Sequence, residues 1–266
     1  MDLSLDGKVA VVTGGSRGIG KAIARALARE GTNFALIARN VSVCEATAVE
    51  LANESGQRVR AYRADTGEDA AVHEAFAQIV KDFGRVDILV NAAAQPGGQA
   101  PPPKLMEISN ENFWPDMNVK VLGYLWCARE AAPHMMQSGW GRIINISGLA
   151  ARSTGSIIGS MRNVSVAALT KNLADELGPF GINVTCVHPG VTRTEKTAGV
   201  IQKRAEAAGV STEEIERRMS EANTIRHLVN SEEIADVVAF LASPKSMAIT
   251  GDAIAAGGGM PGAIYY

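Results

Sequence analysis

The sequence is poor in cysteine and carries no excess of charge of either sign. Its 266 residues include three cysteines, Cys44, Cys127 and Cys186. Their odd number and wide separation argue against a disulfide framework and against a structural zinc site. Lys and Arg together number 26 and Asp and Glu 28, which gives a net charge of -2. This balance provides no basic field that would attract nucleic acid or anionic lipid.

Long hydrophobic runs are also missing. No apolar stretch approaches the roughly 18–20 residues that cross a bilayer. Residues 1–8 lack the basic start and the apolar stretch of a signal peptide. We therefore expect a cytoplasmic protein with no membrane partner. The chain is long enough for a full core, because roughly 150 residues already bury about 70% of the surface of an unfolded chain.

Short runs rich in β-branched residues recur along the chain and predict strands. Their nearly continuous apolar character is typical of strands buried on both faces of a parallel sheet. Segments with helical spacing lie between them, such as the stripe formed by Ile23, Ala26 and Leu27. The alternation predicts an α/β fold, a single doubly wound domain over residues 1–266. The predicted strands are 9–13, 34–37, 59–62, 86–90, 143–146 and 182–187.

Two stretches interrupt this alternation. Residues 95–110 form a loop that three consecutive prolines stiffen. Residues 192–230 are polar with helical spacing, and they are inserted between the last of the strands above and a predicted helix at 232–241. Long inserts after strand ends usually shape a ligand site, so we expect the insert at 192–230 to bind the substrate.

A glycine-rich loop, TGGSRGIG at residues 13–20, follows the first predicted strand and opens a helix. Free backbone N–H groups at the start of a helix suit a pyrophosphate, and glycines let the phosphates approach the backbone. A tight turn without a ligand is the alternative interpretation. The loop predicts a dinucleotide site that includes Gly14, Ser16, Arg17, Gly18, Ile19 and Gly20.

This loop resembles that of the short-chain dehydrogenase/reductase family, and further matches follow in order along nearly the whole chain. Asn91-Ala92-Ala93-Ala94 resembles the family's Asn-Asn-Ala-Gly motif in a variant form, and Asn118 matches the asparagine of the next helix. Residues 144–148 resemble the strand that carries the catalytic serine, here Ser147. Residues 189–194 resemble the family's Pro-Gly turn, and residues 250–258 its terminal strand.

The resemblance implies a Rossmann-type parallel sheet of seven strands flanked by helices. It also implies a nicotinamide cofactor, a small-molecule substrate and a homotetramer whose interfaces use helices near 110–137 and 160–177. Ser147 and Asn118 are implied as catalytic residues. The implied cofactor contacts beyond the glycine loop are Arg39, Asn40, Asp65, Thr66, Asn91, Ala92, Ala93, Asn163, Pro189, Gly190, Val191, Thr192 and Thr194.

The end of the second strand indicates which nicotinamide cofactor is bound. A carboxylate at this position would accept hydrogen bonds from both ribose hydroxyls and repel a 2′-phosphate. This chain has Ala38 there, followed by Arg39, and Arg17 supplies a second cation from the glycine loop. Two guanidinium groups suit a phosphate dianion, so we expect NADP(H) in preference to NAD(H). The alternative is that Arg39 is a solvated surface residue.

The family's usual proton donor is absent. Its tyrosine position falls at Gly159 and its lysine position at Asn163, and no tyrosine lies between Ser147 and Pro179. Hydride addition builds negative charge on the carbonyl oxygen, which a positioned acid must meet. Losing a general acid typically costs about 10²–10⁴ in rate.

Several side chains could replace that donor. Arg162 could stabilise an oxyanion, or it could be a helix-surface residue. Tyr265 and Tyr266 could reach a neighbouring subunit, or they could end in a frayed terminus. His188 is interpreted as structural, and no spacing typical of a metal site occurs.

Two functions stay open. The first is an NADP(H)-dependent oxidoreductase that acts on a carbonyl or alcohol with a non-standard proton donor. The second is a catalytically impaired pseudo-dehydrogenase that binds NADP(H) and acts through assembly or sensing.

Overall fold

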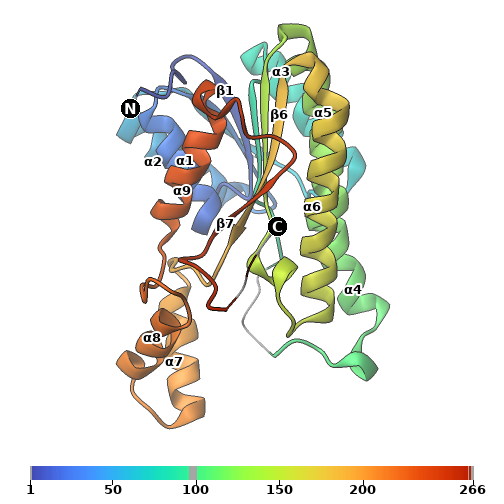
Figure 1. Ribbon diagram of the computed structural model, residues 1–266. Coiled ribbons are helices and arrows are strands. Elements are labelled where there is room, and N and C mark those ends of the chain that lie inside the picture. Colours follow the sequence, from blue (N-terminus) through green and yellow to red (C-terminus); the bar gives the residue numbers. More distant parts are fainter. Residues whose placement is uncertain (1, 96–100, 263, 265–266) are drawn as a thin grey trace.

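The computed structural model describes residues 2–95, 101–262 and 264 (Figure 1). In these residues seven parallel strands form one sheet in the order β3-β2-β1-β4-β5-β6-β7, which confirms the predicted doubly wound fold. The order reverses direction next to β1, between β1 and β4. The strands are β1 Val9–Thr13, β2 Asn33–Ala38, β3 Val59–Arg63, β4 Ile88–Asn91, β5 Gly141–Ile146, β6 Ile182–Pro189 and β7 Ala253–Ala256.

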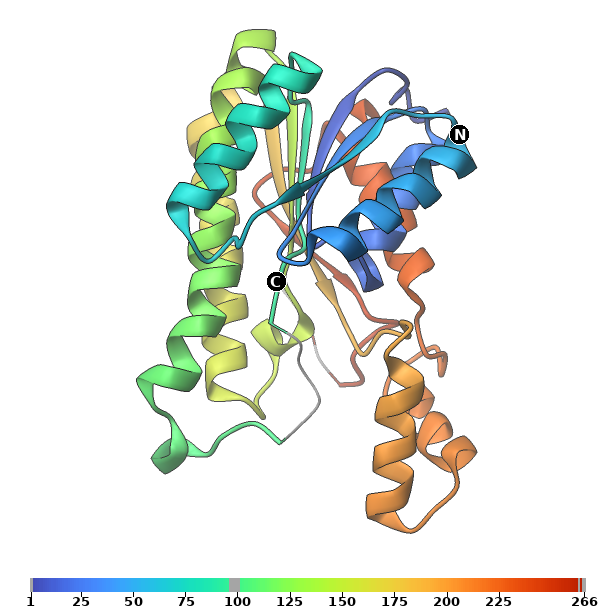
Figure 2. The same cartoon turned by 180° about the vertical axis from the view of Figure 1, so that it is seen from behind.

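Helices cover both faces of the sheet, as Figures 1 and 2 show. The helices α1, α2 and α9 pack on one face, and α3, α5 and α6 pack on the other. Within the described ranges no helix is long and apolar enough to cross a membrane. The helices are α1 Gly18–Arg29, α2 Val41–Ser55, α3 Asp69–Phe83, α4 Asn110–Met117, α5 Gly123–Ser138, α6 Ile157–Leu177, α7 Thr197–Ala208, α8 Thr212–Glu221 and α9 Ser231–Ala242.

A π-helical turn at Asn118–Leu122 joins α4 to α5. Its wider ring closes with the N–H of Gly123, which donates to the carbonyl of Asn118. Gly123 also permits a close approach, because a Cβ there would lie 2.4 Å from the carbonyl oxygen of Thr66. Such turns add a residue to a helix and recur at functional sites.

The insert at residues 192–230 folds into the two helices α7 and α8, which project beyond the carboxyl ends of the strands (Figure 1). Both helices share a small hydrophobic cluster of their own. The ends of the insert meet at a parallel bridge between Arg193 and Asn230, where the N–H of Arg193 donates to the carbonyl of Val229 at 2.7 Å. The cluster consists of Ile201, Ala205, Ile215, Met219 and Leu228.

Candidate functional site

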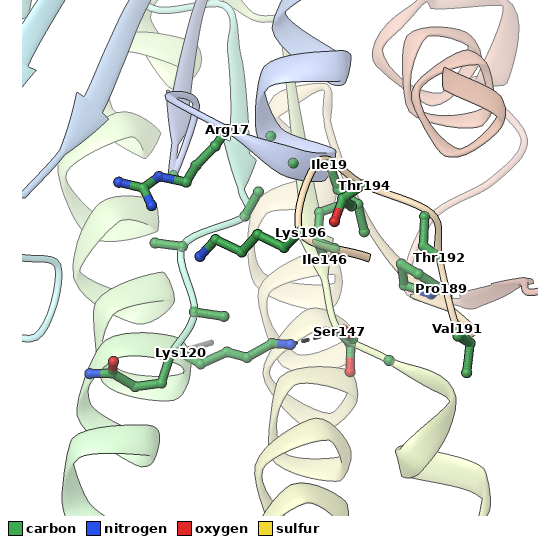
Figure 3. Close-up of a pocket in the computed structure, with 18 of the residues that line it drawn as sticks. Arg17, Ile19, Lys120, Ile146, Ser147, Pro189, Val191, Thr192, Thr194 and Lys196 are labelled. Atoms are coloured by element: carbon green, nitrogen blue, oxygen red, sulfur yellow. Dashed lines mark hydrogen bonds between the residues drawn. The ribbon is translucent and has the colours of Figure 1, made fainter. Parts of the chain in front are cut away.

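A cavity of about 940 Å³ opens at the carboxyl ends of the strands, between the sheet and the insert. It lies beside β1, where the strand order reverses, which is the usual place for a ligand in an open α/β sheet. Figure 3 shows a close-up of its lining. The predicted site residues that line it are Gly14, Ser16, Arg17, Gly18, Ile19, Gly20, Arg39, Asn40, Asp65, Thr66, Ala92, Ala93, Ser147, Asn163, Pro189, Gly190, Val191, Thr192 and Thr194.

Close backbone packing shapes the glycine loop at one end of the cavity. A Cβ on Gly20 would lie 2.4 Å from the carbonyl oxygen of Gly14, and a Cβ on Gly14 would lie 2.9 Å from the Cα of Ala93. Both distances are shorter than non-bonded carbon atoms tolerate, so the loop needs glycine at these two positions. The loop follows β1 directly, and this close packing holds its N–H groups at the start of α1.

The start of α1 binds an anion that the chain itself provides. The N–H of Gly18 donates to both carboxylate oxygens of Glu195, each at 3.1 Å. A carboxylate at this place is favourable because the first N–H groups of a helix are unpaired and carry partial positive charge. The contact is direct evidence that the loop accepts negatively charged oxygen.

Two guanidinium groups lie at the same end of the cavity. Arg17 and Arg39 are both exposed at its lining. Arg39 pairs weakly with Asp65, its Nη1 lying 3.8 Å from the carboxylate, and 53% of its side chain is exposed. Exposed pairs at such distances contribute little, so Arg39 is free to turn toward another anion. Asn40 accepts a hydrogen bond from the N–H of Val43 and caps α2.

Ser147 lies at the opposite end of the cavity, directly after β5. Its side chain is buried, and its hydroxyl donates to the main-chain carbonyl of Asn163 at 3.0 Å. The side-chain oxygen of Asn163 lies 3.3 Å from the same hydroxyl. The hydroxyl proton of Ser147 is therefore used in a hydrogen bond to α6.

Lys120 also reaches this end of the cavity, from the π-helical turn (Figure 3). It is 5% exposed, and its Nζ donates to the carbonyl oxygen of Ser147 at 2.8 Å. Burial and, after it, the nearby charge of Arg162 lower the pKa of this amine to about 7. Sequence reasoning missed Lys120, although one signal was available: a single lysine interrupts the otherwise apolar run from Val119 to Leu122.

Arg162 is not the surface residue that one interpretation of the sequence suggested. Its side chain is 16% exposed, lines the cavity and donates from Nη1 to Asp116 at 2.5 Å. Its Nε is buried with no hydrogen-bond partner among the described residues. This orphaned donor is a costly arrangement unless a bound molecule satisfies it.

Neither position at which the family has its tyrosine and lysine carries a titratable side chain in this chain. Gly159 is buried, and its N–H donates to the hydroxyl of Ser156 at 3.0 Å, which caps α6. A Cβ at this glycine would lie 2.8 Å from the same hydroxyl. Asn163, at the lysine position, is 2% exposed and bonded to Ser147.

Two other titratable groups near this end, both within the described residues, do not compete for the role of acid. His188 is buried, and its burial lowers its pKa to about 4, so the imidazole is neutral near pH 7. The hydroxyl of the buried Tyr124 donates to the carbonyl of Ile146 at 3.0 Å, and Tyr124 does not line the cavity. Tyr265 and Tyr266, two candidates from the sequence, lie outside the described residues.

Two predicted site residues lie away from the cavity. Asn91 is fully buried, and its amide donates to Asn145 at 3.0 Å instead of lining the cavity. Asn118 begins the π-helical turn with its Cβ close to Gly67, and the described lining includes Lys120 but not Asn118. The extra residue of that turn makes the register of this stretch differ from that of a regular helix.

No group of three or more His, Cys, Asp or Glu side chains that could hold a metal occurs among the described residues. The doubly wound sheet, the glycine loop and the anion-binding helix start together define a nucleotide-binding α/β protein. Comparison with known proteins identifies the family within this class. The family model described as enoyl-(acyl carrier protein) reductase matches residues 14–261. This chain belongs to the short-chain dehydrogenase/reductase family.

Individual relatives match over nearly their whole length. The chain is 33% identical over 254 residues to the short-chain reductase protein NovJ of Streptomyces niveus, covering 95% of this chain and 94% of that one. It is 31% identical over 262 residues to the 3-oxoacyl-[acyl-carrier-protein] reductase FabG of Aquifex aeolicus, covering 98% and 100%. Among solved structures, L-sorbose reductase from Gluconobacter frateurii, complexed with NADPH and L-sorbose, superposes with a TM-score of 0.93 at 28% identity, covering 99% and 100%.

Proposed function

We propose that this protein is an NADP(H)-dependent oxidoreductase that interconverts a carbonyl group and an alcohol. The observation that carries the proposal is one cavity with two chemically different ends. At one end the N–H of Gly18 already binds a carboxylate. At the other end Ser147 and Lys120 place a hydroxyl oxygen and an amine at the wall. A dinucleotide needs the first end, and a reacting carbonyl needs the second.

The preference for NADP(H) rests on the residues at the end of β2. Ala38 provides no carboxylate that would repel a 2′-phosphate, and Arg39 is exposed at the cavity with only a weak ion pair. A guanidinium fork matches phosphate oxygens. Among the relatives, the L-sorbose reductase was solved with NADPH and YwfH is described as an NADPH-dependent reductase, which supports the same preference.

The insert at 192–230 forms the substrate side of the cavity in this proposal. Val200 of α7 and Met219 of α8 both line it, so the segment offers apolar surface as well as charge. Met219 also belongs to the hydrophobic cluster of the insert. A substrate with an apolar portion beside its carbonyl group fits this lining.

The pseudo-dehydrogenase is the second candidate, and the side chains absent at Gly159 and Asn163 favour it. Both candidates bind NADPH, and only the oxidoreductase turns over. The test titrates NADPH and NADH by fluorescence and then follows NADPH oxidation with L-sorbose, ethyl acetoacetate and a set of aliphatic and aromatic aldehydes. Oxidation that depends on the carbonyl compound supports the enzyme. Tight NADPH binding without oxidation supports the second candidate, and no binding contradicts both.

Assembly into a homotetramer is part of the proposal. Large apolar side chains stay exposed on the outer faces of α4, α5 and α6, the helices expected at the interfaces. An exposed apolar patch of this kind is typical of an assembly surface. Sedimentation of a tetramer would agree with it, and a monomer would contradict it. The side chains are Trp114, Leu125, Met136, Ile157, Met161 and Val164.

A further inference from the structure

We propose that Lys120 is the catalytic residue that gives its Nζ proton to the carbonyl oxygen of the substrate, in place of the absent tyrosine. The inference rests on the proposed function and names the donor that this function lacks. Lys120 comes from an element different from the one that carries Gly159 and Asn163. It reaches the neighbourhood of Asn163, because its amine donates to the main-chain carbonyl of Ser147 and the hydroxyl of the same serine contacts the side-chain oxygen of Asn163.

Neither of the two substituted positions carries a long side chain. Gly159 has no side chain, and Asn163 is short and turned toward the hydroxyl of Ser147. The π-helical turn then directs Lys120 into the cavity wall (Figure 3). One N–H of the ammonium group bonds to the carbonyl of Ser147 at 2.8 Å, which leaves two donors for a ligand.

The charges around Lys120 suit a proton donor. Arg162 of α6 disfavours its charged form, whereas Asp116 of α4 and Cys186 of β6 favour it, and burial outweighs them all. His188 of β6 adds no charge near neutral pH, because burial lowers its pKa to about 4. The resulting pKa of Lys120, about 7, is near the value at which a general acid is both protonated and able to release its proton.

Among the described residues, Arg162 and Ser147 are less suited to supply the proton. Arg162 holds its proton too tightly, since a guanidinium stays protonated in proteins. Its unpartnered Nε can instead stabilise charge on the substrate oxygen. Ser147 donates its hydroxyl to the carbonyl of Asn163. Lys196 also lines the cavity, between Arg17 and Lys120 (Figure 3), and it follows Glu195, which contacts the glycine loop.

Atoms and electrons balance in the reduction when NADPH supplies the hydride and Lys120 supplies the proton. Bound NADPH supplies the hydride. With NADPH bound, a C–H bond would form at the carbonyl carbon as a hydride left the cofactor, so the carbonyl would be reduced and NADPH would be oxidised to NADP⁺. An N–H bond of Lys120 breaks as the O–H bond of the alcohol forms. The neutral amine then takes up a proton from water, and the reverse steps oxidise an alcohol.

The first test measures kcat against pH for the carbonyl compounds named above. It compares the wild type with Lys120→Met, Lys120→Arg and the control Lys171→Met, an exposed lysine of α6 paired with Asp175. We expect Lys120→Met and Lys120→Arg to lose at least about a hundredfold in kcat, because Arg keeps the charge but not the transferable proton. The wild-type kcat for reduction should fall above about pH 7, and both variants should lose this dependence. NADPH affinity should change by less than about threefold.

The outcomes distinguish a failure of Lys120 as the proton donor from a failure of the proposed function. Turnover that persists within about threefold in Lys120→Met overturns the role of Lys120 and leaves the oxidoreductase intact. A wild type that binds NADPH and turns over no carbonyl compound overturns the oxidoreductase, and the donor role with it. A loss of kcat in Lys120→Met that Lys120→Arg restores also overturns the donor role, because it shows a purely electrostatic one.

A second readout needs no substrate. Cyanate reacts with neutral amines, so a lysine with a lowered pKa is carbamylated faster near neutral pH. Peptide mapping by mass spectrometry at pH 7 should show modification of Lys120 at least about ten times as fast as that of Lys171. NADP⁺ should slow the reaction at Lys120 and leave Lys171 unchanged. Equal rates at the two lysines would contradict the proposal even in a protein whose variants fold poorly.

Discussion

The two ends of the cavity differ in the groups that line them and in how far substitution is tolerated there. At the glycine-loop end the working groups are backbone N–H groups, and Gly14 and Gly20 are fixed by contacts with other backbone atoms. At the Ser147 end the working groups are side chains, and two family positions hold Gly159 and Asn163 without any change of fold. Binding built on backbone geometry therefore tolerates little substitution, whereas in our proposal the proton donor comes from another element.

The largest effect should come from the amine buried at the Ser147 end. Folding lowers the pKa of Lys120 from its ordinary value of 10.5 to about 7. Between these values the unfolded chain holds a proton that the folded protein has released, so this group makes stability rise with pH across the window. The slope reaches up to about 1.4 kcal/mol per pH unit. Below pH 7 both states are protonated, and the full cost of burying the charge remains.

Lys120→Met should remove this rise of the unfolding free energy with pH. Urea unfolding of both proteins from pH 6 to pH 10 gives the difference in unfolding free energy at each pH. We expect the variant to be the more stable protein at pH 6 and its advantage to shrink as the pH rises. A difference that does not vary with pH would show that Lys120 is not buried as a low-pKa amine.

A smaller loss should follow a methyl group added at the glycine-loop end. Gly20→Ala places its Cβ against the carbonyl of Gly14, and forced overpacking costs about 1–3 kcal/mol. Gly199→Ala in α7 is the matched control, because open space surrounds that position and alanine favours a helix by about 0.5–1 kcal/mol. Urea unfolding and NADPH titration measure both variants. Equal effects at the two glycines would disprove the close-packed loop.

Arg39→Ala should weaken NADPH binding by about tenfold, which corresponds to about 1.4 kcal/mol. NADH binding should change by less than about twofold, because NADH lacks the 2′-phosphate. Fluorescence titration of both cofactors measures the ratio, with Arg63→Ala, on β3 outside the described lining, as the control. Loss of both affinities in equal measure would remove the assignment of Arg39 to the phosphate.

The smallest effect concerns Glu195, whose carboxylate lies on the N–H of Gly18. Phosphate oxygens that bind there must displace it. Glu195→Gln removes the competing charge and should tighten NADPH binding by about threefold. Isothermal titration of both proteins at low salt measures the change, and weaker binding by the variant would show that the carboxylate assists the cofactor.

The sequence predicted the features that depend on local pattern. Val9–Thr13 matches the first predicted strand at both ends, since a buried parallel strand is a continuous apolar run. The glycine loop was predictable for a similar reason, because its residues are consecutive in the chain. Lys120 was not predictable in the same way. Its position depends on a π-helical turn and on a hydrogen bond from its Nζ to the main-chain carbonyl of Ser147, which is distant in sequence. Arg162 depends likewise on its pairing with Asp116 across two helices.

The bridge between Arg193 and Asn230 has a consequence for engineering. It fixes the two ends of the insert beside each other on the framework, while the helices between them pack around their own hydrophobic cluster. The insert also contacts the framework between these ends: Glu195 accepts a hydrogen bond from the N–H of Gly18, and the N–H groups of Thr224 and Ile225 donate to the carbonyls of Gly259 and Gly258. Exchanging the insert for that of a relative therefore requires that these contacts be kept together with the bridge.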